Sequence, residues 1–106
     1  MTTTSPRTGR PAMSPEHAAR VRLALSLLVH RHEDRRAPVA DLLAVSVQAI
    51  GRILNEQNGA SAETTARLAR AIGAAPEGVP DEQAARALRL MPQAEIRARV
   101  AAFVVA

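Results

Sequence analysis

Gln48 and Arg52 are the side chains whose types and spacing point most directly to a chemistry. They lie four residues apart in the stretch VQAIGRIL, so on a helix they share one face. A glutamine amide can pair with N6 and N7 of adenine, and a guanidinium can pair with O6 and N7 of guanine. Neighbouring Val47 offers an apolar surface that suits a thymine methyl group. The formal net charge of +4 agrees with a polyanionic partner.

Other chemistries find little support in the composition. The chain has no Cys, which excludes disulfides, thiol catalysis and Cys-ligated zinc. His30 and His32 are two residues apart, so a helix directs them to different sides, and we expect no metal. No Gly-rich phosphate loop or nucleophile elbow is present, so we expect neither an enzyme nor a cofactor. Phe103 is the only aromatic residue, which argues against a reader of single strands that stacks bases.

Helix signals recur along the whole chain, and no stretch alternates as a strand does. Ser14, followed by Pro15 and Glu16, has the pattern of a capped helix start. The helix that begins there has an apolar face formed by Val21, Leu25, Leu28 and Val29, and Leu23 and Leu27 widen this face. We expect further helices to begin near Pro38 and, with a serine cap, after Ser46 and after Ser61; the helix after Ser61 ends at Gly73. Two more helices are expected, one capped by Asp81 and one that follows Pro92 and covers residues 93–105. The predicted fold is all-α, a compact bundle of five to six helices.

The segment Arg36 to Asn55 has the features of a helix-turn-helix. Ala40 is small enough to let the second helix cross closely, and Val45 can fill the turn. The apolar anchors are Val39 and Leu43 in the first helix and Ile50 and Ile53 in the second. The second helix then directs four residues outward, namely Val47, Gln48, Gly51 and Arg52.

The stretch LLAVSVQAIGRILNEQNGASAETTARLARAIG resembles the Cro/repressor-type helix-turn-helix family. LLAVS is similar to the family's first helix and turn, VQAIGRILN to its recognition helix, and SAETTARLARAIG to the helix that follows. The resemblance runs from Arg36 to Val79, about half the chain, and the wording GASAETTARLARAIG is similar to an antitoxin branch of the family. It implies that Val47, Gln48 and Arg52 contact bases and that Arg36, Ser46 and Asn55 contact phosphates.

Three positions depart from the family pattern. Ala44 stands where the turn usually has Gly, and a positive φ there would cost ~1 kcal/mol. Arg36 replaces the usual Gln, and Pro38 lacks a backbone N–H that otherwise meets a phosphate. Gly51 inside the recognition helix costs ~1 kcal/mol relative to Ala, and either allows a close approach to DNA or is simply tolerated.

The ends of the chain divide it into three parts. Residues 1–13 form a basic tail that we expect to be disordered, and residues 14–79 form the helix-turn-helix DNA-binding domain. Arg7 and Arg10 in the tail are either solvated or insert into an adjacent minor groove, since PRTGRP partly matches an AT-hook. Residues 80–106 are expected to be helices that dimerise.

The last predicted helix carries apolar residues at helical spacing. These residues are Ile96, Val100, Phe103 and Val104. They either complete the core of the monomer or form a dimer seam, and we expect the seam because dimers that read two half-sites are the rule for this architecture.

The sequence therefore predicts a regulator of transcription, expected to be a repressor, that binds double-stranded DNA specifically as a homodimer. A cytoplasmic, nucleoid-associated location agrees with the absence of Cys and of any apolar run of the ~18 residues that span a membrane. The second hypothesis is an antitoxin-like module that binds a toxin-like protein through residues 81–106. The third is a nucleoid protein that binds DNA without sequence preference.

Overall fold

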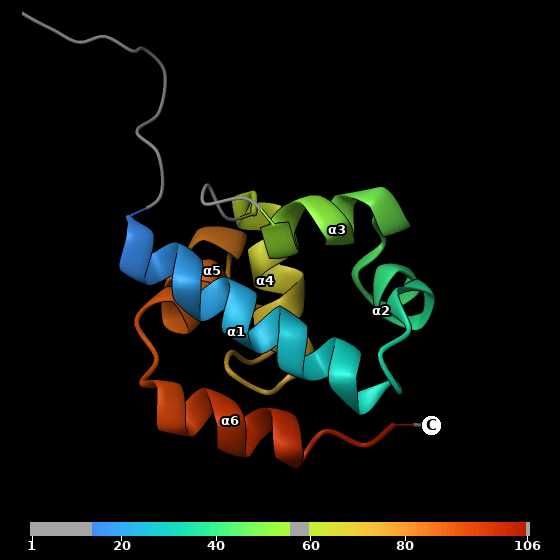
Figure 1. The fold of residues 1–106 in the computed structure, drawn as a ribbon. Helices are drawn as coiled ribbons and strands as arrows, with labels where there is room; N and C mark the ends of the chain where they lie inside the picture. Colours follow the sequence, from blue (N-terminus) through green and yellow to red (C-terminus); the bar gives the residue numbers. More distant parts are fainter. Residues whose placement is uncertain (1–13, 56–59, 106) are drawn as a thin grey trace, which may run out of the picture.

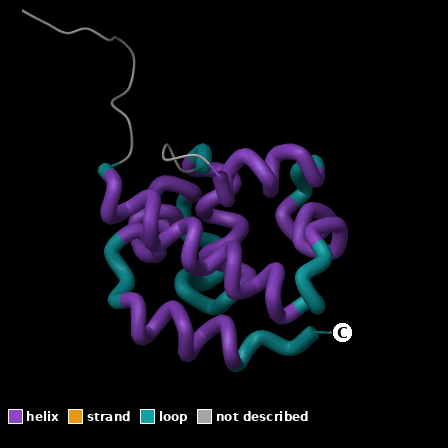
Figure 2. The backbone as a smooth tube through the Cα atoms, in the orientation of Figure 1, coloured by secondary structure: helices purple, strands orange, loops and turns teal. Residues whose placement is uncertain are grey.

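The computed structural model describes residues 14–55 and 60–105, and this part of the chain is all-helical. It forms six helices and no strand, as Figure 1 and Figure 2 show. The helices are α1 (Pro15–Arg31), α2 (Arg36–Leu43), α3 (Val47–Asn55), α4 (Ala62–Ala71), α5 (Asp81–Arg89) and α6 (Gln93–Ala101). The predicted all-helical bundle is therefore confirmed. None of these helices by itself has both the length and the apolar character needed to cross a membrane.

All six helices contribute to one hydrophobic core. Helix α1 crosses the front of the bundle and packs against α5 and α6, while α4 lies in the middle and packs against α5 (Figure 1). The largest fully buried side chains include Leu25 of α1, Leu43 of α2, Ile50 of α3, Leu68 of α4 and Leu88 of α5. Helices α3 and α6 lie on opposite sides of the bundle (Figure 1). Residues from Asp81 onward thus share a core with the rest of the chain.

Serine side chains begin three of the helices, as the sequence predicts. The hydroxyl of Ser14 accepts a hydrogen bond from the amide of His17 at 3.2 Å. Ser46 caps α3 in the same way through Ala49, and Ser61 caps α4 through Thr64, at 3.0 and 3.1 Å. Each hydroxyl satisfies one of the amides that the first turn of a helix leaves without an internal partner.

Two predicted helix starts are wrong by one or two residues. Helix α2 begins at Arg36 rather than near Pro38, since a third-position proline lacks only an amide that has no partner within the helix. Pro80 rather than Asp81 is the residue before α5, and no side chain caps that helix. The Asp81 carboxylate instead accepts from Arg70 of α4 at 2.9 Å. Asp81 therefore ties two helices together rather than capping one.

The assignment of Ile96 and Val100 to a dimer interface is wrong. Their side chains are only 0% and 2% exposed, because α6 turns them toward α1 and the common core. The helix also ends at Ala101, earlier than predicted, and Phe103 is half-buried with its ring 5.8 Å from that of His32. Only Val104 of the predicted seam is well exposed, at 83%.

Candidate nucleic-acid interface

Helix α3 has one buried face and one exposed face. Ile50 and Ile53 anchor it in the core. Val47, Gln48 and Arg52 are all exposed, and Val47 shows 45% of its surface, a large fraction for a valine. The three residues expected to contact bases thus share the solvent side of one short helix.

A three-residue connection sets α3 almost at right angles to α2. Residues 44–46 join the two helices, which are bent by 101° relative to each other. Ala44 turns the chain with a φ of 59°, in the left-handed region. The next amide, of Val45, donates to the carbonyl of Ala40 at 3.0 Å, which closes the end of α2 in the way that glycine usually does. Ala44 therefore has the positive φ considered above from the sequence, with the strain that this costs an alanine.

The side chain of Arg36 lies over Gly51. A Cβ atom built on Gly51 would be 3.0 Å from Nη1 of Arg36, closer than ordinary van der Waals contact. Arg36 itself is exposed at the first position of α2. The glycine thus leaves room for a guanidinium on the outward side of α3, next to Gln48 and Arg52. This contact gives Gly51 a role that the sequence does not reveal.

The other predicted phosphate contacts lie at the two ends of α3. Ser46 is exposed, and although its hydroxyl oxygen accepts from the Ala49 amide, its own proton is available to another acceptor. Asn55 is exposed at the last position of the helix. Arg7 and Arg10, the predicted minor-groove arm, lie outside the described residues.

Arg67 positions α2, a role that sequence reasoning missed. From α4 its Nη1 donates to the carbonyl of Leu43 at 3.2 Å, and its other terminal nitrogen pairs with Glu63 one turn earlier. The carbonyl of Leu43 is one of those that the last turn of α2 leaves without an internal partner. The spacing of Glu63 and Arg67 signals a helix-surface ion pair, but nothing in the sequence indicates the bond to α2.

Several arginines hold the fold together. Within the described residues, arginines donate to main-chain carbonyls elsewhere in the chain, namely Arg20 to Met91, Arg31 to Phe103, Arg67 to Leu43, Arg70 to Val79 and Arg99 to Gly73. Because these guanidinium groups already have acceptors within the chain, they are less available to phosphates. The positive charge is therefore a weaker sign of nucleic-acid binding than its total suggests.

No cluster of three or more histidine and acidic side chains in residues 14–55 and 60–105 is close enough to hold a metal ion. Comparison with models of known families, with curated proteins and with solved structures finds no significant match for this chain. The geometry of α2 and α3 is thus the basis on which a function is inferred.

Proposed function

We propose that this protein is a sequence-specific regulator of transcription, a repressor, that binds double-stranded DNA through a helix-turn-helix formed by α2 and α3. The observation that carries the proposal is the exposure of Gln48 and Arg52 on α3. That short helix is anchored by Ile50 and Ile53 and set at 101° to α2. Helix-turn-helix motifs join two helices at about 90–120° through a turn of three or four residues.

The contacts around α3 support an assignment of roles. Gln48 and Arg52 read base edges in the major groove, and Val47 packs on a thymine methyl group. Arg36, Ser46 and Asn55 bind phosphates on either side and fix the orientation of the helix without reading sequence. In a homodimer, two copies of α3 enter successive major grooves about 34 Å apart.

The test is selection of bound duplexes from a random pool, followed by affinity measurements with variants. We expect Gln48→Ala and Arg52→Ala each to weaken binding to the selected duplex by about tenfold or more, because each paired contact contributes ~1–3 kcal/mol of discrimination. Binding to unrelated DNA should change much less.

Helix α6 offers a matched control. Gln93 and Arg97 are also four residues apart and also exposed, and Gln93 lies in the first turn of α6 as Gln48 does in α3, but they lie on the opposite side of the bundle. We expect Gln93→Ala and Arg97→Ala to leave affinity for the selected duplex unchanged. Equal effects of the two pairs, or an unaltered sequence preference in both α3 variants, would remove the assigned readout.

The antitoxin-like alternative is less well supported. It requires that residues 81–106 offer an apolar surface to a partner protein. The main apolar side chains of α5 and α6, including Leu88, Ile96 and Val100, are buried within the chain itself. We therefore favour DNA as the partner. A nucleoid protein without sequence choice is distinguished from a repressor by competition with unrelated DNA.

A further inference from the structure

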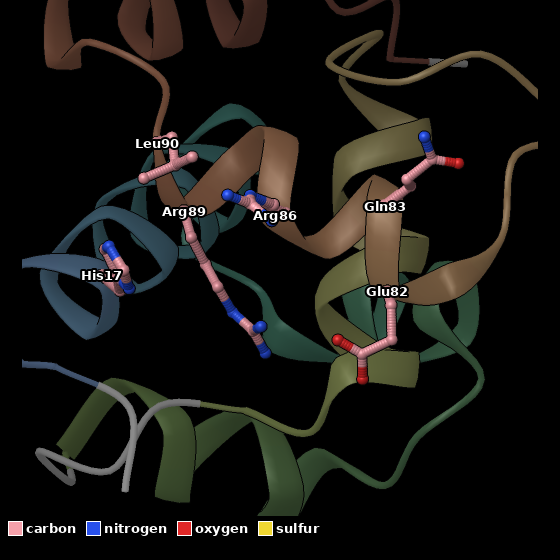
Figure 3. Close-up of a pocket in the computed structure, with 6 residues that line it drawn as sticks. All are labelled: His17, Glu82, Gln83, Arg86, Arg89 and Leu90. Carbon is pink, nitrogen blue, oxygen red and sulfur yellow. The ribbon is translucent and has the colours of Figure 1, made fainter. Parts of the chain in front are cut away.

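A second cluster of charged side chains lies around a cavity between α1 and α5, and no role described so far uses it. The cavity has a volume of about 400 Å³ and is lined by His17, Glu82, Gln83, Arg86, Arg89 and Leu90 (Figure 3). The volume is large enough for a small molecule, but the cavity is open to solvent and its lining is mostly polar or charged, so its charged groups and not its enclosure carry the argument.

The guanidinium group of Arg89 is incompletely satisfied. Its Nε is buried and has no hydrogen-bond partner among residues 14–55 and 60–105. Figure 3 shows the side chain extended from α5 into the space bordered by the His17 ring and the Glu82 carboxylate. A buried donor without an acceptor is unfavourable, so an acceptor that enters the cavity relieves an existing cost.

The neighbouring charges favour an anion with an additional hydrogen-bond donor. Arg86 and Arg89 lie three residues apart on one face of α5, and no ion pair or hydrogen bond engages either guanidinium within the described ranges. A guanidinium group suits the oxygens of a phosphate or carboxylate. Glu82 lines the same cavity without an ion-pair partner there, and as an acceptor it suits a hydroxyl group.

We propose that this cavity binds a small phosphate monoester that carries hydroxyl groups, with the phosphate on Arg86 and Arg89 and a hydroxyl donating to Glu82. The imidazole of His17 lies across the cavity on α1 and is a further donor to the phosphate. The ligand comes from outside residues 1–13, since that stretch has no acidic residue to complement the arginines. This site does not depend on the proposed DNA readout.

The test is an NMR titration of the full chain with sn-glycerol 3-phosphate, inorganic phosphate and glycerol at constant ionic strength. We expect a saturable shift of the Arg89 Nε–H resonance with both phosphates and none with glycerol. Arg86→Gln and Arg89→Gln should each weaken phosphate binding by about tenfold. Arg97→Gln, an exposed arginine on α6, should not change it. Because Arg86 is exposed, its variant tests the site even if Arg89→Gln lowers stability.

Glu82→Gln should change two measured quantities in opposite directions, namely the affinity for inorganic phosphate and the preference for glycerol 3-phosphate. Removing this carboxylate should strengthen binding of inorganic phosphate, because a like charge is lost, and should reduce the preference for glycerol 3-phosphate over inorganic phosphate. A linear, non-saturating response that is the same in the wild type and Arg86→Gln overturns the proposal. It is also overturned if both arginine variants weaken binding to unrelated duplex DNA by the same factor as binding to phosphate, since the cavity would then serve the DNA backbone.

Discussion

Ala44 ends α2 in a conformation that glycine adopts at lower cost. Its φ of 59° brings the Cβ atom close to the following carbonyl, and such strain costs an alanine roughly 1 kcal/mol relative to glycine. We expect Ala44→Gly to raise the free energy of unfolding by about 1 kcal/mol, measured by urea denaturation.

Ala98 is the matched control for that substitution. It is exposed in the interior of α6, where a glycine should lower stability by about 1 kcal/mol. If both glycine variants lose stability, the left-handed turn at Ala44 is not the source of strain inferred here.

Adding a single methyl group at Gly51 should have opposite effects on stability and on DNA affinity. We expect Gly51→Ala to stabilise the protein by up to ~1 kcal/mol, because alanine is the better helix former. The added Cβ should also displace Arg36 and weaken DNA binding by up to about fivefold, as for an exposed ionic contact. Thermal unfolding and a duplex titration give the two quantities.

An Arg36→Ala background separates the causes of that loss. With Arg36 already removed, Gly51→Ala should stabilise the protein as before and leave DNA affinity unchanged. A loss of affinity that persists in this background means that the methyl group contacts DNA directly.

At the scale of elements, the serine caps of α3 and α4 differ in their distance from the proposed recognition surface. Ser46→Ala and Ser61→Ala should each cost about 1 kcal/mol of stability, because each removes a bond to an amide of the first turn. Only Ser46 lies next to the proposed recognition surface, so only its variant should weaken DNA binding when both are fully folded. Denaturation curves and duplex titrations at low temperature test this; equal affinities in the two variants contradict it.

Helix starts that depend on local residues are readable from the sequence, and those that depend on distant partners are not. Ser14, Ser46 and Ser61 cap the helices predicted for them, because a cap involves only the next three residues. Asp81 has the same local pattern, but Arg70 of α4 binds its carboxylate instead. The contact of the Arg36 side chain with Gly51 could not be predicted from the sequence either, because it depends on the angle of 101° between α2 and α3.

At the scale of the molecule, periodicity identifies an apolar face without saying what covers it. Ile96 and Val100 have the spacing of a seam, and the prediction of a dimer interface failed for them because α1 offers the complementary face within the chain. The exposed α3 face was predicted correctly, since Ile50 and Ile53 leave only one side of a short helix for the core.

Because Ile96 is buried and Val104 is exposed, substitutions at these two positions should have different effects on stability. Ile96→Ala should destabilise the fold by about 2–5 kcal/mol, as for other truncations in a packed core. Val104→Asp, at an 83% exposed position, should change stability by less than ~0.5 kcal/mol. Sedimentation of the second variant then tests the homodimer: if Val104 lies at the seam, the dissociation constant rises, and an unchanged constant places the seam elsewhere.

The arginines that donate to main-chain carbonyls limit how the protein's charge can evolve. Replacing one of these arginines by a neutral residue removes a hydrogen bond between two segments and lowers the stability of the fold. Substitutions that make the chain less basic are therefore disfavoured at these positions, whether or not the protein binds a ligand. Exposed arginines such as Arg36, Arg52 and Arg97 carry no such constraint from the scaffold. Selection can therefore tune the attraction for polyanions at these positions while the architecture stays intact.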